Sequence, residues 1–453
     1  MDADLLEQEI LRRIVPSDDE IRSVEERASK LEELIRNYDK DHGFDIKVKF
    51  AGSFSKGTFL SNPDLDVFLM FPRDIDRKTM TEEGLSVGES LLDKAERAFA
   101  ENPYISGFFE GLDIDMVPCY ELPDATHIIT SMDRTPFHTD FIKSRLDRDG
   151  KNQVRLLKKF MKGIGAYGAE PSSRGFSGYL CELLIVRYGT FRKVLEAATT
   201  WGQKPRLFID KMKGPSIESA IVFYDPVDTN RNVASAVYED TLCLFETAAK
   251  DYLDNPGEEF FFPKTRDPIE RDELAKACSE RDVRLVSVSF GKPDVLEDSI
   301  HAQAWKTQYA IVSKIEHFGF GPIRAHHVIL DDAIEIAVEI ECDRLSSTCK
   351  HVGPPTWVHN SSDFLKKWKG CGYGGPFIEN GRWNVIADRQ YSDVKTMLLS
   401  ETANSGIGKD IDTRTMRIMD HDETLADADC GLLTELLFPI MPWSVGSHIE
   451  KSL

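Results

Sequence analysis

The spacing of apolar residues predicts helices and strands over the first 120 residues of the chain. A first helix covers Leu5–Ile14 and is stopped by Pro16. Ser17 and Glu20 form a capping box for a second helix, which reaches about Tyr38. There follow a strand from Ile46 that ends at the polar turn Gly52-Ser53, a strand over Leu65–Phe71, a helix over Thr79–Ala100, and strands over Ile105–Phe109 and Leu112–Val117. This mixture predicts an α/β or α+β domain.

The pattern turns helical from about residue 150 to 250 and becomes mixed again after Pro256. The clearest helical segments of the middle region are Val154–Met161, Gly178–Tyr188 and Ala234–Leu253. The last region has a strand at Arg284–Phe290, a helix at Glu297–His317, strands at His326–Leu330 and Ala333–Cys342, and a further strand at Arg382–Ala387. The β-α-β-β order favours a split βαβ sandwich of ferredoxin type.

The length of 453 residues is enough for several domains. We predict three, with boundaries where the pattern changes: an α+β domain over residues 1–145, a helical domain over 146–255, and a C-terminal region over 256–453 that contains the βαββ unit.

Membrane and secreted classes are disfavoured by the sequence. No apolar run approaches the roughly 20 residues that span a bilayer. The acidic start, Met1 to Glu7, lacks the basic and apolar parts of a signal peptide. The eight cysteines form no CxxC pair or zinc-like cluster, so we expect reduced thiols in a cytoplasmic protein.

The charge is unevenly distributed along the chain. The net charge is -21, which by itself argues against a nucleic-acid partner. The segment Phe141–Lys213, however, holds 16 Lys or Arg against 6 Asp or Glu. A basic block in an acidic protein is typical of a phosphate-binding surface, although a solvated basic helix face would give the same count.

Three familiar motifs occur in the wrong structural setting. Gly163–Gly168 and Gly370–Gly375 satisfy GxGxxG, but neither lies between a predicted strand and a predicted helix. Gly84–Gly88 satisfies GxSxG within a predicted helix and not at a strand-to-helix elbow. These matches predict neither a dinucleotide site nor a hydrolase.

Paired carboxylates at the start of an apolar strand are the most informative feature. Asp64 and Asp66 alternate with Leu65, so they point to one face of the strand that starts there. Asp115 alternates in the same way on a later strand, and neighbouring strands would bring the three carboxylates onto one patch. Such oxygen ligands favour Mg²⁺ or Mn²⁺ over zinc. Most such pairs are merely exposed strand ends, so this motif needs support.

The support comes from the preceding turn and from longer motifs. A Gly-Ser turn at Gly52-Ser53, followed by Asp-x-Asp and a distant Asp, is the signature of polymerase beta-like nucleotidyltransferases. Further motifs, in chain order, are Asp115–Tyr120, Asp133–His138, Val154–Lys158, Tyr167–Glu170, Arg174–Leu184, Asp225–Asp228 with Arg231–Ala234, and Pro376–Trp383. Together they resemble the archaeal (class I) CCA-adding enzymes over most of the chain.

This resemblance implies an α+β multidomain fold with a nucleotidyltransferase head, a helical central domain and a C-terminal α/β RNA-binding region. It implies template-independent addition and repair of the 3′-terminal CCA of tRNA from CTP and ATP, with release of pyrophosphate. Two Mg²⁺ ions, for which Mn²⁺ could substitute, would be held by the metal carboxylates Asp64, Asp66 and Asp115. The oligomeric state is left open, with a homodimer as one option.

The resemblance also implies roles for seven other residues. Those matching triphosphate, sugar or base contacts are Ser53, Lys56, Thr135, His138, Lys158, Tyr167 and Arg231. Arg231 matches the arginine that hydrogen-bonds the incoming base. The family often has Glu, Arg and Tyr where this chain has Asp64, Lys56 and Phe54. The change at Lys56 removes a bidentate guanidinium, which weakens the transfer of its role.

Two alternative functions remain open at this stage. A poly(A) polymerase-like or oligoadenylate synthetase-like enzyme would use the same three carboxylates. A non-catalytic RNA-binding relative would share the fold, although the intact set of carboxylates argues against it. Incorporation of both CTP and ATP, stopping after three nucleotides, would separate these functions.

Overall fold

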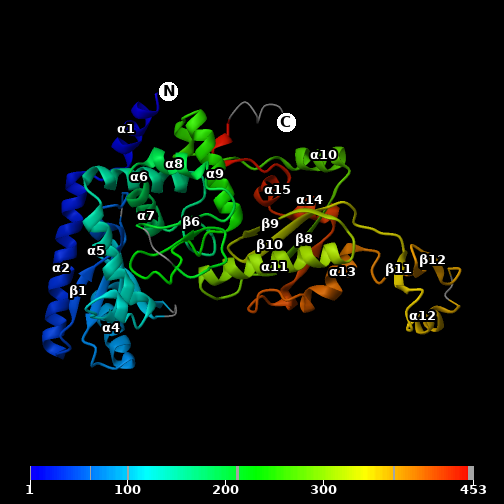
Figure 1. Ribbon diagram of the computed structural model, residues 1–453, viewed down its shortest axis with the longest axis horizontal. Coiled ribbons are helices and arrows are strands. Elements are labelled where there is room, and N and C mark those ends of the chain that lie inside the picture. The colour runs from blue at the N-terminus through cyan, green and yellow to red at the C-terminus, as the bar shows by residue number, and fades with distance from the viewer. Residues whose placement is uncertain (1, 62, 99–101, 211–213, 371–372, 447–453) are drawn as a thin grey trace. The chain divides into compact units, whose positions relative to one another are not determined.

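The computed structural model of the chain describes every residue except 1, 62, 99–101, 211–213, 371–372 and 447–453 (Figure 1). The chain divides into two compact units. The N-terminal unit runs to Lys264 and takes in the segment that starts at Met441, and the C-terminal unit is Thr265–Ile440. Within the described ranges, no helix is both long and apolar enough to cross a bilayer.

A five-stranded sheet with the order β1-β2-β5-β4-β3 forms the first part of the N-terminal unit. The strands are β1 (Lys47–Phe50), β2 (Leu65–Phe71), β3 (Asp93–Ala98), β4 (Tyr104–Phe109) and β5 (Leu112–Tyr120). The pair β2 and β5 is parallel, and the other neighbouring pairs are antiparallel. The predicted strands are therefore present, and β2 and β5 are neighbours.

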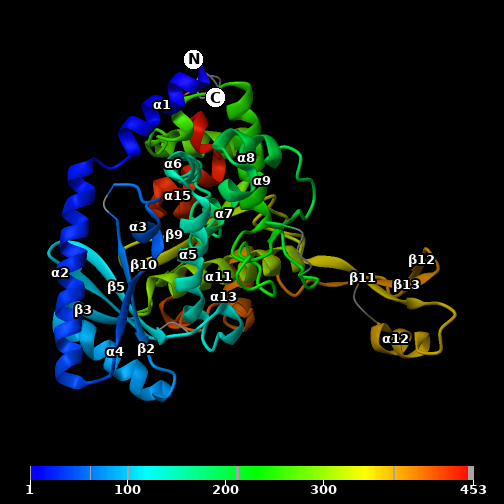
Figure 2. The same cartoon turned by 60° about the vertical axis from the view of Figure 1, so that its left-hand side comes forward.

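Two helices pack on one face of this sheet, α2 (Asp18–His42) and α4 (Arg77–Leu91) (Figure 2). The predicted capping box of Ser17 and Glu20 starts α2. Leu31 of α2 and Met80 of α4 share one buried core with Leu65 of β2. The residues directly before and after Leu65 therefore point to the opposite face of the sheet, on which the short helix α3 (Gly52–Lys56) lies.

The prediction of one helix over Thr79–Ala100 is wrong. The helix α4 ends at Leu91, and Asp93–Ala98 forms the strand β3 at the edge of the sheet. Apolar residues in that segment continue a helical period, but pairing with β4 overrides the local pattern. The turn predicted at Gly52-Ser53 is also different, since these residues begin α3.

Helices make up the rest of the N-terminal unit. They are α1 (Ala3–Ile14), α5 (Thr135–Arg145), α6 (Arg148–Gly163), α7 (Gly178–Tyr188), α8 (Phe191–Ala198) and α9 (Glu239–Asp254), with a small parallel pair β6 (Arg206–Leu207) and β7 (Val222–Phe223). Their common core contains the buried rings of Phe160, Phe191 and Tyr252. The helix predicted to start at Ala234 starts at Glu239, because the Asn232 side chain accepts hydrogen bonds from Phe223 N and Ala234 N and holds a turn there.

The C-terminal unit contains the predicted βαββ order. Its main sheet has the order β14-β8-β10-β9, so β10 lies between β8 and β9 as a split βαβ unit requires. Its strands and helices are α10 (Arg271–Arg281), β8 (Arg284–Gly291), α11 (Glu297–His317), β9 (Pro322–Ile329), β10 (Ala333–Ile340), α13 (Val394–Glu401), β14 (Arg417–Met419), α14 (His421–Asp427) and α15 (Cys430–Leu437). The edge strand β14 comes from late in the chain and was not predicted.

A second, three-stranded sheet with the order β11-β13-β12 is inserted in this unit. It comprises β11 (Thr348–Pro355), β12 (Phe377–Glu379) and β13 (Arg382–Asp388), with α12 (Ser361–Trp368) beside β11. Short 3-10 turns in the two units are Ala125–His127, Ser131–Arg134, Glu258–Phe260, Thr402–Asn404, Thr413–Thr415 and Pro442–Ser444.

Candidate active site

The strand pairing places two of the predicted carboxylates opposite each other. Asp66 of β2 is the direct partner of Asp115 of β5 in the parallel ladder. Asp64 lies immediately before β2, is exposed, and has the same alternation as Asp66. All three residues follow the alternation that leads away from the α2 and α4 core, so they belong to the opposite face of the sheet, on which α3 lies.

Burial and mutual repulsion make these carboxylates difficult to ionise. Burial, together with the charge of Asp115, raises the pKa of Asp66 to about 6, although Lys56 opposes the shift. Burial also raises the pKa of Asp115, even though Ser106 Oγ donates a hydrogen bond to it. Asp64 is exposed as a whole residue, but partial desolvation of its carboxylate by surrounding atoms and the charges of Asp113 and Asp115 raise its pKa. A bound cation would relieve this repulsion.

Gly52 packs directly against the carboxylate of Asp66. A Cβ atom at position 52 would lie 1.6 Å from Asp66 Oδ2, and the backbone φ of Gly52 is +62°. Only glycine accommodates both the conformation and the close approach. The Ala51 N–H also donates to the Asp66 carbonyl at 2.9 Å, so the start of α3 and the start of β2 are held together. Ser53 follows directly in α3 and is half-buried.

These residues fit a divalent cation in ligand type and in charge. Carboxylate oxygens are the ligands that Mg²⁺ and Mn²⁺ prefer, and burial together with the charge of Asp115 makes the ionised form of Asp66 unfavourable without a cation. In the part of the chain that the structure describes, no three acidic, histidine or cysteine side chains are gathered closely enough to form a ready metal-binding cluster. The three carboxylates share a face of the sheet without converging on one point.

A buried ion cluster connects α3 with the helices. The carboxylate of Glu182, in α7, is fully buried and accepts from Lys56 Nζ at 2.5 Å and Lys158 Nζ at 3.1 Å. Thr58 Oγ1 donates to the same carboxylate at 2.5 Å. Burial alone would raise the pKa of Glu182, but the two lysines lower it. The cluster therefore holds two cations against one carboxylate, next to Asp66. The charge of Lys56 opposes the rise in the pKa of Asp66.

A second cluster is organised by Asp225, in the loop after β7. Its buried carboxylate contacts His138 Nε2 at 2.8 Å and accepts from Arg231 Nη1 at 2.9 Å. Tyr179 O–H donates to Asp225 at 3.3 Å, and its ring stacks on His138 with centroids 4.2 Å apart. Burial lowers the pKa of His138 in spite of Asp225, which favours the neutral imidazole near pH 7. The Arg231 side chain remains 36% exposed and keeps donors free for a ligand.

The remaining predicted residues lie around these clusters. Tyr167, between α6 and α7, packs its O–H against Gly178, where a Cβ would lie 2.9 Å away. Burial raises the pKa of Tyr167, and Lys162 Nζ lies 5.0 Å from its ring centroid. Thr135 is the half-buried first residue of α5, one turn before His138. The structure thus places the carboxylates, Ser53 and Lys56 on or beside β2, α3 and β5, Thr135, His138 and Lys158 on α5 and α6, and Tyr167 and Arg231 in loops of the helical region.

The structure adds residues that the sequence prediction did not select. Glu182, Asp225, Tyr179 and Thr58 provide the contacts that hold the predicted cations and His138. A usable signal was present for Glu182, because it stands alone in the apolar run Leu180–Leu184. A carboxylate in such a helix must be buried with a cationic partner.

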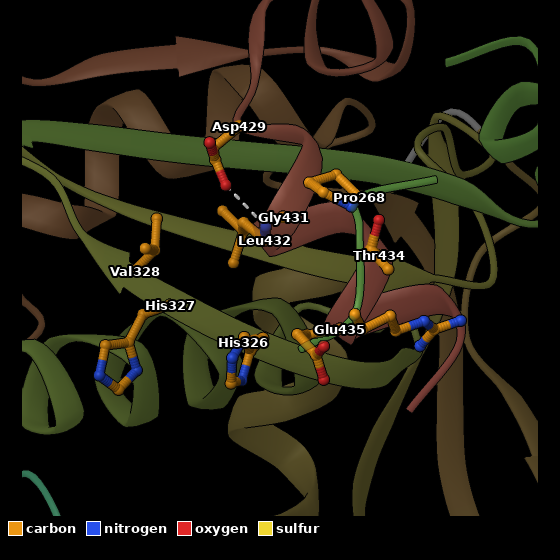
Figure 3. Close-up of a pocket in the computed structure, with 10 residues that line it drawn as sticks. Pro268, His326, His327, Val328, Asp429, Gly431, Leu432, Thr434 and Glu435 are labelled. Carbon is orange, nitrogen blue, oxygen red and sulfur yellow. Dashed lines mark hydrogen bonds between the residues drawn. The ribbon is translucent and has the colours of Figure 1, made fainter. Parts of the chain in front are cut away.

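The C-terminal unit has a hollow of its own between β9 and α15, with a volume of about 180 Å³ (Figure 3). His326 and Glu435 line it from these two elements, and Asp429 caps α15 by accepting from Leu432 N at 2.8 Å. Burial lowers the pKa of His326, although the charge of Glu435 opposes the shift. Its volume is below the roughly 300 Å³ of typical small-molecule sites.

Comparison with known proteins assigns the whole chain to one family. The family model described as nucleotidyltransferase domain matches residues 29–138, that of tRNA nucleotidyltransferase, second domain, matches 152–262, and that of CCA-adding enzyme, C-terminal domain, matches 281–419. The CCA-adding enzyme of Thermoplasma volcanium is 36% identical over 417 residues, which cover 91% of this chain and 93% of that protein. The enzyme of Methanosarcina barkeri is 36% identical over 374 residues, covering 81% and 82%. The chain therefore belongs to the archaeal, class I CCA-adding enzymes, a family of tRNA nucleotidyltransferases.

Proposed function

We propose that this chain builds and repairs the 3′-terminal CCA of tRNA from CTP and ATP without a nucleic-acid template, releasing pyrophosphate. The proposal rests on one observation: Asp66 pairs with Asp115 on the α3 face of the sheet, and Gly52 packs against the Asp66 carboxylate. Family membership supports the substrate assignment, and the two side-chain clusters beside the carboxylates supply groups for a triphosphate and a base.

Divalent metal ions form part of the proposal. The nucleotidyltransferase fold implies dependence on a divalent cation, and we assign two Mg²⁺ ions, replaceable by Mn²⁺, to Asp64, Asp66 and Asp115. When bound, such ions activate an attacking hydroxyl and neutralise charge on a leaving pyrophosphate. The protein itself holds Asp66 and Asp115 on paired strands, with Gly52 packed against the Asp66 carboxylate.

The cationic side chains are proposed to bind the triphosphate. Lys56 and Lys158 share only one carboxylate, that of Glu182, so the cluster retains positive charge for phosphate oxygens. Ser53 at the start of α3, Thr135 and Tyr167 would add hydroxyl donors to the phosphates or the sugar. His138, when neutral, donates Nε2–H to Asp225 and keeps Nδ1 as an acceptor, so beside the triphosphate it would accept a hydrogen bond from a ligand hydroxyl rather than carry charge.

Arg231 is proposed to select the base. Asp225 fixes one edge of its guanidinium, and the exposed remainder presents donors and no acceptor. Cytosine offers O2 and N3 as acceptors and adenine offers N1, so one donor group can serve both. The N–H edges of uracil and guanine would be rejected.

The partner would be a tRNA, held through its phosphates by the basic segment Phe141–Lys213. A cytoplasmic location and a homodimer stay predictions. The proposal is tested by incubating tRNA that lacks CCA with Mg²⁺ and CTP, ATP or both. Addition of two C residues from CTP, and of one A only afterwards, supports it. Repeated addition of A would indicate a poly(A) polymerase-like activity, and no addition would favour a non-catalytic relative.

A further inference from the structure

A second, larger cavity lies in the N-terminal unit, between α2, α3, α5 and α6. Its volume is about 610 Å³, within the roughly 300–1,000 Å³ of small-molecule sites. Phe54, Ser55 and Gly57 of the α3 segment line it, whereas Gly52 and Lys56 contact Asp66 and Glu182 of the reaction centre. The cavity therefore does not include the carboxylates, although α3, α5 and α6, which line it, also carry Lys56, His138 and Lys158.

One wall of this cavity is basic. Lys143, Arg148, Lys151 and Arg155 line it, and none of the four makes an ion pair with a carboxylate in the described part of the chain. Unpaired cations are notable in a protein with a net charge of -21, in which carboxylates outnumber Lys and Arg by 77 to 56. Four such side chains around one hollow define an anion-binding wall.

Arg155 strengthens this interpretation because it is buried. It is 6% exposed, and it donates from Nε to the Phe59 carbonyl at 2.9 Å and from Nη1 to Asn152 Oδ1 at 2.9 Å. Both partners are neutral, so a buried guanidinium lacks a counter-charge, which is unfavourable unless an anion binds there. Burial correspondingly lowers the pKa of Arg155.

The opposite wall is apolar, with Phe50 and Phe54 half-buried and Pro16 buried. Flat aromatic and apolar surface opposite a cationic wall suits a ligand that has a base at one end and phosphates at the other. The exposed carboxylates of Asp18 and Glu25 on α2 also line the cavity and would repel a long polyanion. These features favour a free nucleotide over an RNA backbone.

We propose that this cavity binds a second nucleoside triphosphate, with its phosphates on Lys143, Arg148, Lys151 and Arg155 and its base against Phe50 and Phe54. The site is distinct from the proposed catalytic one and does not depend on which reaction that centre performs.

The test counts bound nucleotide on the full chain by equilibrium dialysis with labelled CTP, without and with Mg²⁺. We expect two equivalents per wild-type chain and one in the charge-reversed Arg148→Glu/Lys151→Glu variant. A milder Arg148→Gln/Lys151→Gln variant guards against misfolding and should weaken the second equivalent tenfold or more. Lys193→Glu, an exposed lysine of α8 outside the cavity, is the matched control and should keep two.

Two further measurements separate this site from its alternatives. Inorganic pyrophosphate should displace the second CTP from the wild type, and failure to do so would overturn the placement of the phosphates. The first equivalent of CTP should bind the variants with an affinity within about twofold of wild type, so loss of the second equivalent is not loss of the reaction centre. The proposal is overturned if wild type binds one equivalent, or if the reversed variant still binds two. It is also overturned if that variant loses only tRNA affinity.

Discussion

At the scale of single residues, Asp66 is held where its charge is unfavourable. Its carboxylate is partly buried, faces Asp115 across the parallel pair and rests on Gly52. Such a residue lowers the stability of the metal-free fold, so its presence makes sense as a binding group rather than a structural one.

The pH dependence of stability tests this directly. The pKa of Asp66 is about 6 in the fold against 3.8 for an unperturbed aspartate, so the folded state binds its proton more tightly. Stability contributed by the protonated form is present below pH 3.8 and is lost as pH rises to about 6. Without divalent metal, the free energy of unfolding of Asp66→Asn relative to wild type should rise by about 2 kcal/mol between pH 4 and 7.

Denaturant unfolding of both proteins at several pH values measures this difference. Asp41→Asn, at an exposed position near the end of α2, is the control and should show no comparable trend. A pH-independent difference for Asp66→Asn would contradict the raised pKa.

Arg231 allows a second test at this scale. Removing its guanidinium should reduce discrimination against UTP and GTP by about tenfold or more, since one or two hydrogen bonds to the base are lost. Incorporation of all four nucleotides into tRNA ending before C and before A measures this. Arg206→Ala, which removes an arginine bonded to Tyr224 and Ile217, is the matched control. Unchanged selection in Arg231→Ala would make Arg231 a structural residue.

At the scale of elements, the short helix α3 determines the geometry of the site. It follows β1, its first residue Gly52 packs against Asp66, and its last residue Lys56 donates a hydrogen bond to Glu182. The sequence predicted the strands and the shared face of the carboxylates because alternation within a strand is a local property. It did not predict the partners of Lys56 and His138, because Glu182 and Asp225 are 126 and 87 residues away. The error at β3 has the same origin, since pairing with β4 is not visible in the local pattern.

Gly52→Ala tests the importance of α3. The new Cβ would lie 1.6 Å from Asp66 Oδ2 at a φ of +62°, so α3 or the carboxylate must move. We expect nucleotide addition to fall about tenfold or more. Gly43→Ala is the matched control, because Gly43 also has a positive φ, +77°, but nothing lies within 4 Å of its Cβ position.

The control should show only the backbone strain of about 1–2 kcal/mol, with activity retained. Steady-state rates and denaturant unfolding of the two variants provide the comparison. Equal effects of the two substitutions on activity would show that contact between Gly52 and Asp66 has no special role.

At the scale of the whole molecule, charge is divided between an acidic chain and the basic segment Phe141–Lys213. Composition alone suggested an acidic protein without a nucleic-acid partner, and the local count reversed that interpretation. The three matched family regions cover residues 29–138, 152–262 and 281–419, and the compact units divide after Lys264, whereas the boundaries near residues 145 and 256 stay predictions. Local periodicity marks elements well but does not show that the first sheet and the helical region form one compact unit.

The salt dependence of tRNA binding belongs to this scale. If the basic segment contacts phosphates, affinity should fall at least about a hundredfold between 50 and 200 mM salt, because counterions are released on binding. Filter binding or fluorescence anisotropy at several salt concentrations gives the slope. An affinity that does not change with salt would place the RNA elsewhere on the protein.

The central claim is that the carboxylates paired across β2 and β5 form the reaction centre for CCA addition. The most direct measurement is nucleotide addition to tRNA lacking CCA, with CTP, ATP and Mg²⁺, by wild type, Asp66→Ala and Asp115→Ala. Asp113→Ala is the matched control, an exposed carboxylate two residues before Asp115 on the same strand.

The account predicts three added nucleotides for wild type and Asp113→Ala. It predicts at least about a thousandfold slower addition of both C and A for the other two variants, equal to about 4 kcal/mol of activation free energy. Both variants should remain folded by circular dichroism. Near-wild-type addition by folded Asp66→Ala or Asp115→Ala would contradict it.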